Sequence, residues 1–225
     1  MRQVRPFEEN SLSLSRKKME KVSAVPLWQR WLSPHELVSD KERAGKTQIL
    51  DTQLFAEEIS TIYSGKQTKS VQRAELLSLS KAKLSEGREA LEASLMRDRD
   101  GAVYVGAHAI LIDQLIGGLV AAAENYVFAT KARFAIMAVG GYGRGELAPL
   151  SDIDLLFVMP QRHKKSDAEF VEFLLYMLWD LGLVVGHASR TVHQNIAAAG
   201  EDITICTSLL EMRTLPVPPQ FLSRC

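Results

Sequence analysis

Two aspartates one residue apart, Asp152 and Asp154, are the residues of this chain with the clearest capacity for chemistry. They stand at the start of an apolar run, residues 153–158, whose β-branched and aromatic content predicts a buried strand. Because side chains alternate between the two faces of a strand, both carboxylates are expected on one face, while Ile153 and Leu155 face the core. Two carboxylates on one face can hold Mg²⁺, which takes one or two protein carboxylates together with water and substrate phosphates.

A glycine-rich segment precedes this pair and follows another predicted strand, residues 134–139. Gly140 and Gly141 carry no side chains, so backbone N–H groups can approach a triphosphate closely. Residues 142–147 are expected to begin a helix whose N-terminus favours an anion. The alternative is a plain glycine hairpin, with the two aspartates serving a turn. A dinucleotide-binding fingerprint fits less well, because the spacing is G-x-G-x-G and not G-x-G-x-x-G.

A strand, a glycine turn and paired carboxylates on a second strand form the layout of a metal-dependent nucleotidyltransferase site. On this interpretation the two aspartates are the catalytic residues and the metal ligands. The candidate nucleotide-binding residues are Gly140, Gly141, Arg144 and Ser151. Arg144 either contacts a phosphate or lies in solvent, and the sequence leaves both open.

Three ordered blocks of the chain resemble the bacterial PII uridylyltransferase family, the bifunctional uridylyltransferase/uridylyl-removing enzymes. The blocks are GGYGRGEL followed by SDIDLLF, then LWDLGLVVGHASRT, then DITICTSLLEMR. The resemblance covers about residues 75–215. Three blocks in the same order make it highly specific.

The resemblance implies a DNA polymerase β-like nucleotidyltransferase domain, an α/β (α+β) fold with a small mixed sheet after a helical N-terminal extension. It also implies transfer of UMP from UTP to a tyrosine of the PII nitrogen-regulatory protein, with release of pyrophosphate. UTP and PII are then the expected partners and Mg²⁺ the expected cofactor. Catalysis would rest mostly on positioning and on neutralisation of charge.

Enzymes of this superfamily often recruit a third carboxylate from a later strand. The predicted strand at 184–189 carries no acid, so the nearest later candidates are Glu201 and Asp202. Asp202 lies in a block that resembles the family, but it also suits the N-cap of a helix over residues 203–215, and that structural role is the stronger interpretation.

Two further polar residues of interest, His187 and Arg190, lie on or directly after the predicted strand that begins at residue 184. Each lies either near the substrates or in a purely structural setting. The chain contains no H-E-x-x-H motif, no C-x-x-C motif and no His-Asp dipeptide. Longer family members carry an HD phosphohydrolase domain and two ACT domains, so uridylyl removal and glutamine sensing are not expected of these 225 residues.

Two other functions stay open at this point. One is a glutamine synthetase adenylyltransferase-like enzyme, which shares the glycine turn and the D-x-D pair. The other is an inactive, truncated remnant that binds nucleotide or PII without turnover. Release of pyrophosphate with Mg²⁺ separates the remnant from an enzyme, and preference for UTP or ATP separates the two enzymes.

Helices must position such a site. Leucines at helical spacing predict two helices within residues 69–128, and a third apolar stripe leads to the strand at 184–189. We therefore expect four segments: a poorly defined, partly disordered extension, a helical lead-in, the nucleotidyltransferase domain and an atypical tail. Their ranges are 1–68, 69–128, 129–215 and 216–225.

The composition of the chain limits which kinds of partner and which cellular compartment are expected. The 27 basic and 27 acidic side chains cancel, which gives no attraction to nucleic acid or to an anionic membrane surface. The second predicted helix is interrupted by His108, Asp113 and Gln114, so no membrane span is expected. Cys206 and Cys225 offer no disulfide framework. A cytoplasmic protein without nucleic-acid or membrane partners is expected.

Overall fold

The computed structural model describes residues 49–215, and all of them belong to one compact unit. The predicted tail at 216–225 and most of the predicted extension lie outside the described residues. The described elements, in chain order, are α3 Thr52–Ser64, α4 Lys69–Asp98, α5 Gly101–Ala122, the π-helical turn η2 Ala123–Val127, β1 Ala135–Ala138, α6 Gly140–Gly143, β2 Ile153–Met159, α7 Lys165–Asp180, β3 Val185–Thr191, α8 Val192–Glu201, α9 Ile203–Leu210 and β4 Arg213–Thr214.

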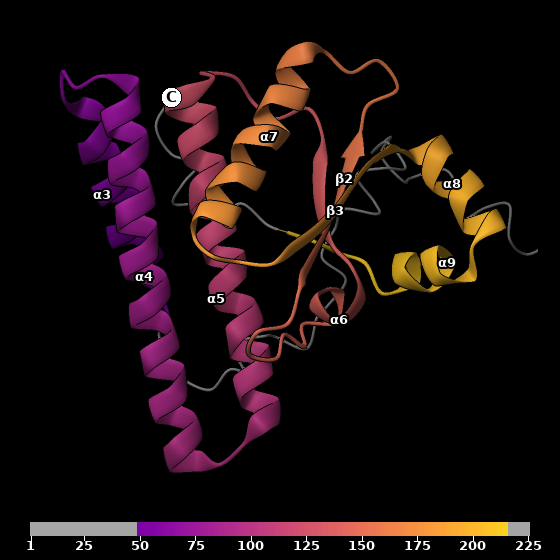
Figure 1. The fold of residues 1–225 in the computed structure, drawn as a ribbon, viewed down its shortest axis with the longest axis horizontal. Helices are drawn as coiled ribbons and strands as arrows, with labels where there is room; N and C mark the ends of the chain where they lie inside the picture. The colour runs from indigo at the N-terminus through magenta and orange to yellow at the C-terminus, as the bar shows by residue number, and fades with distance from the viewer. Residues whose placement is uncertain (1–48, 216–225) are drawn as a thin grey trace, which may run out of the picture. The chain divides into compact units, whose positions relative to one another are not determined.

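A four-stranded sheet in the order β3-β2-β1-β4 forms the centre of the described chain. β2 pairs with β3 in parallel, whereas β1 pairs with β2 and with β4 in antiparallel orientation. Figure 1 shows α3, α4 and α5 on one side of this sheet and α8 and α9 on the other. The prediction of a small mixed sheet after helices is confirmed.

The predicted helices are present at the positions of their leucine stripes. Leu76, Leu84 and Leu91 of α4 are buried, and α5 buries Leu111 and Leu115. One hydrophobic cluster joins these residues to the core faces of the strands and to α7. The helical lead-in and the sheet therefore share a single core across the boundary predicted at residue 128.

Helix α3 lies within residues 1–68, for which the sequence predicts only a poorly defined extension. Asp51 caps this helix, because its carboxylate accepts hydrogen bonds from the N–H groups of Gln53 and Leu54 at 3.1 and 3.0 Å. Phe55 is fully buried, and its ring lies against Gly118 of α5, where a Cβ atom would overlap it. Residues 52–64 therefore belong to the core.

Two predicted helices have different bounds in the structure. The helix expected to begin at residue 142 begins at Gly140 and ends at Gly143. The helix expected over 203–215 ends at Leu210, because the chain then extends into β4 and pairs with β1. After α9, the chain returns to the sheet at Arg213.

The expectation that the second helix cannot span a membrane needs a correction. Gly101–Val127 is long and apolar enough for a span by length and composition, with a mean hydropathy of 1.6 in its most apolar window. However, 72% of that window is buried inside the molecule, against α3, α4 and α7. A core helix passes the same test, so the finding is weak support for a membrane segment.

Candidate functional site

Strand β2 separates the core from the site. Ile153, Leu155 and Phe157 are buried in the hydrophobic core. Asp154 and Leu156 alternate with them and lie on the opposite face, which lines a cavity. The period of two read from the sequence therefore predicts correctly which residues of β2 face away from the core.

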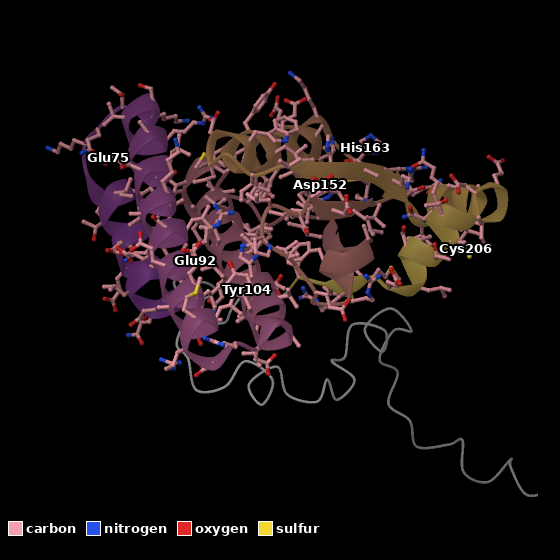
Figure 2. All side chains as sticks on the ribbon, turned by 60° about the horizontal axis from the view of Figure 1, so that its bottom comes forward. Glu75, Glu92, Tyr104, Asp152, His163 and Cys206 are labelled. Atoms are coloured by element: carbon pink, nitrogen blue, oxygen red, sulfur yellow. The ribbon has the colours of Figure 1, made fainter. Side chains whose placement is uncertain are left out.

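The negative charge of Asp152 acts on Asp154. Asp152 is exposed and directly precedes β2, and Figure 2 shows it beside the sheet. Burial, and after it the negative charge of Asp152, raise the pKa of the Asp154 carboxyl above its ordinary value. A carboxyl whose charged form is disfavoured by burial and by a neighbouring carboxylate is a usual setting for a bound cation, which neutralises the charge.

The Asp154 carboxylate lies between two glycines from different segments. Gly140 has a positive φ of 60°, and a Cβ atom there would lie 3.4 Å from Asp154 Oδ2. Gly186 is the register partner of Asp154 on β3, and a Cβ atom there would lie only 2.5 Å from Asp154 Oδ1. Both glycines leave room for the carboxylate, and Gly186 was missed in the sequence although a glycine inside a strand signals such a close approach.

The glycine turn, residues 140–145, lies in the connection between β1 and β2. Gly143 N donates to the Val139 carbonyl at 3.0 Å, and Val139 N donates to the Asp154 carbonyl at 3.1 Å. Because β1 and β2 are antiparallel neighbours, the hairpin alternative and the helical alternative are both partly correct. The turn starts on the sheet directly beside the strand that carries Asp154.

A cavity of about 300 Å³ lies between the sheet and α9. Its lining residues are Val139, Gly140, Asp154, Leu155, Leu156, Gly186, His187, Ala188, Arg190, Asp202, Thr204, Ile205, Ser208 and Leu209. Of the predicted site residues, the cavity brings together Gly140, Asp154 and Asp202. It also includes His187 and Arg190, for which the sequence had left a structural role open.

The other candidate nucleotide-binding residues, Gly141, Arg144 and Ser151, do not line the cavity, and neither does Asp152. Arg144 Nε donates to Glu146 at 3.0 Å, and its Nη1 lies 2.8 Å from Glu211. Ser151 is exposed. Arg144 is exposed, as one of the two sequence alternatives has it, and it is paired with carboxylates of the protein.

Asp202 is the N-cap of α9. Its Oδ1 atom accepts a hydrogen bond from Thr204 N at 2.7 Å. Hydrogen bonds from Thr204 lower the pKa of the Asp202 carboxyl, so the group stays ionised. The capping role predicted from the sequence is confirmed, while a role as third carboxylate stays a prediction.

The donor set fits a magnesium ion that is completed by substrate. Within residues 49–215, no group of three or more His, Cys, Asp or Glu side chains could enclose a metal ion. Asp152 and Asp154 provide two carboxylates of like charge, and the glycines on both sides of Asp154 leave space at its oxygens. Magnesium commonly binds through one or two carboxylates together with substrate phosphates, which matches this pair.

Comparison with known proteins agrees with this geometry. Residues 127–194 match the family model described as "Nucleotidyltransferase domain". This range runs from the turn before β1, through the glycine turn and both aspartates, to the start of α8. Residues 127–194 are therefore similar to nucleotidyltransferase domains.

The similarity extends to particular enzymes, all with the name bifunctional uridylyltransferase/uridylyl-removing enzyme. The chain is 43% identical over 148 residues to the enzyme of Rhodopseudomonas palustris, which covers 64% of this chain and 16% of that protein. It is 36% identical over 188 residues to the enzyme of Nitrobacter hamburgensis (80% of this chain, 20% of that protein). It is 36% identical over 197 residues to the enzyme of Azospirillum brasilense (83% and 21%).

The resemblance found in the sequence blocks is thus confirmed. The chain spans about a fifth or less of the length of these curated relatives. No solved structure matches it. The domain match and the names of these relatives both refer to transfer of a nucleotidyl group.

Proposed function

We propose that this domain transfers UMP from UTP to a tyrosine of the PII nitrogen-regulatory protein. The tyrosine oxygen attacks the α-phosphorus, the bond from that phosphorus to the bridging oxygen of the β-phosphate breaks, and pyrophosphate leaves. The proton of the tyrosine passes to solvent. The observation that carries the proposal is the cavity in which Asp154, the glycine turn and α9 meet, in a chain whose relatives are named uridylyltransferases.

Each group of residues around the cavity has its own role in the proposed reaction. Asp152 and Asp154 would hold Mg²⁺, which supplies neutralisation of the phosphate charge during transfer. Gly140 and Gly141 leave the backbone of the turn open to the triphosphate. The apolar side chains of Leu156 and of α9 would exclude water from the rest of the nucleotide. A reaction that consumes UTP also agrees with the cytoplasmic location expected from the sequence.

The test is transfer of labelled UMP from UTP to purified PII with Mg²⁺, comparing the wild-type chain with Asp154→Asn. We expect the variant to lose transfer on the order of 10²–10³-fold, because a preorganised charge at the reacting phosphate is removed. Its melting temperature should be retained, since burial and Asp152 already disfavour the charged form of Asp154.

Glu172→Gln is the matched control, because this exposed carboxylate on α7 does not line the cavity. It should transfer at the wild-type rate.

Equal transfer by the wild type and Asp154→Asn would reject the metal-site assignment. Transfer of AMP instead of UMP would favour the adenylyltransferase alternative, and nucleotide binding without transfer by the folded wild type would favour the inactive remnant.

A further inference from the structure

Tyr142 is the most deeply buried side chain of the glycine turn, with 1% of its surface exposed. Its hydroxyl donates a hydrogen bond of 2.6 Å to Asp113 Oδ1 on helix α5. Burial is the main cause that raises the pKa of Tyr142 well above its ordinary value, and Asp113 adds to it. The phenol therefore keeps its proton at neutral pH and remains the donor in this bond.

Arg213, the first residue of β4, completes the network. Its Nη1 and Nη2 atoms donate to the two carboxylate oxygens of Asp113 at 2.6 and 3.1 Å, a bidentate pairing. Nη2 also lies 3.3 Å from the carbonyl oxygen of Tyr142, and the guanidinium lies 5.5 Å from the centre of the tyrosine ring. The side chains of Asp113 and Arg213 are only 14% and 18% exposed, so water screens the pair weakly.

The next two residues of the turn contact the same part of the chain. Gly143 packs against the backbone carbonyl of Glu211, where a Cβ atom would overlap it. Arg144 is ion-paired with the Glu211 side chain at 2.8 Å. Residues 142–144 are thus held by residues 211–213, which join α9 to β4. Since α9 forms one wall of the cavity, the turn and this wall are fixed to each other.

We propose that Asp113, Tyr142 and Arg213 are positioning residues for nucleotidyl transfer. They fix the glycine turn, and with it Gly140 beside Asp154, in the place where the triphosphate is bound. None of the three lines the cavity, so they act through the turn and not on the substrate. The inference rests on the proposed function and adds that the helical lead-in contributes Asp113 to the working site. Misplacement of a binding group by about 1 Å is enough to cost a large factor in rate.

Tyr142→Phe is the primary variant, because it removes one hydroxyl and leaves Asp113 paired with Arg213. Tyr63→Phe is the matched control, since this tyrosine on α3 stacks on Tyr126 with 4.6 Å between ring centres and loses the same atom away from the site. Truncation of Arg213 to alanine is avoided, because it would leave the buried carboxylate without its counter-charge.

Hydrogen–deuterium exchange measures how well the backbone amides of the turn are protected, and it needs no substrate. We expect the peptide of residues 139–147 to exchange faster in Tyr142→Phe than in the wild type. In Tyr63→Phe the same peptide should exchange at the wild-type rate. Equal exchange of this peptide in all three proteins would overturn the proposal.

Kinetics at a temperature where every variant is folded provide the second readout. We expect the KM for UTP to rise about tenfold in Tyr142→Phe, with a smaller fall in kcat, because the turn contributes to binding of the phosphates. Arg213→Lys keeps the charge but loses the bidentate geometry, so it should change KM in the same direction. A lower melting temperature with wild-type KM and kcat would assign the network to stability alone and overturn the proposal.

The two proposals fail in different ways. A folded wild-type chain that transfers no UMP to PII rejects the proposed function. The exchange measurement still decides whether Tyr142 holds the glycine turn, because it needs neither UTP nor PII.

Discussion

At the residue scale, Asp202 shows how one side chain can serve the fold and face the site. It caps α9 through Thr204 N and lines the same cavity as Asp154. A negative charge at a helix N-terminus is favourable, which agrees with the lowered pKa of the Asp202 carboxyl. The capping role and a catalytic role can be separated, because asparagine caps helices about as well as aspartate but carries no charge.

We predict that Asp202→Asn keeps the melting temperature and most of the transfer activity, because the cap is retained. Asp202→Ala should lower the melting temperature by roughly a few degrees, because Thr204 N loses its acceptor. Thermal unfolding and UMP transfer measure the two effects. A large loss of transfer in Asp202→Asn, at an unchanged melting temperature, would instead identify Asp202 as the third carboxylate.

At the scale of elements, the parallel pairing of β2 with β3 decides the environment of Asp154. The register sets Gly186 opposite Asp154 and Ala188 opposite Leu156. A glycine inside a strand weakens it, because it has no side chain to pack. In this sheet the carboxylate of Asp154 occupies the space that a side chain at Gly186 would fill.

We predict that Gly186→Ala lowers UMP transfer by about tenfold to a hundredfold, because the new Cβ displaces the carboxylate that it faces. The fold should survive, since the Asp154 side chain can rotate away. Gly200→Ala on α8 is the control, because a Cβ atom there meets nothing within 4 Å. Circular dichroism and initial rates of transfer check both variants, and a wild-type rate for Gly186→Ala would contradict the tight fit.

At the scale of the whole molecule, the sheet with the site and the helices before it form one folded unit. Phe55 of α3 packs on α5, and α5 in turn contacts α7 and provides Asp113 to the glycine turn. Loss of packing in the first helix should therefore lower the stability of the entire described unit.

We predict that Phe55→Ala lowers the free energy of unfolding by about 3–5 kcal/mol, because a fully buried ring is lost and a cavity remains. Leu54→Ala, at a neighbouring position that is 46% exposed, should change it by no more than about 0.5 kcal/mol. Denaturant unfolding of both variants measures the difference. Similar small effects would mean that α3 is not part of the cooperative core.

The sequence by itself determined the features that depend on neighbours along the chain. The alternation around Asp154 gave the two faces of β2, and the leucine stripes gave α4 and α5. The glycine turn and the D-x-D pair lie within twenty residues of each other, so their combination was visible without a structure. These are local periodicities, which follow from the geometry of one strand or one helix.

Only the tertiary structure decided which distant residues meet at the site. Gly186 reaches Asp154 through strand pairing, and Arg213 reaches Asp113 across 100 positions of sequence. The end of α9 at Leu210 was likewise set by the pairing of β4 with β1. No local pattern contains these contacts, because they depend on the packing of the whole core, and that packing brings Gly186 to the carboxylate of Asp154.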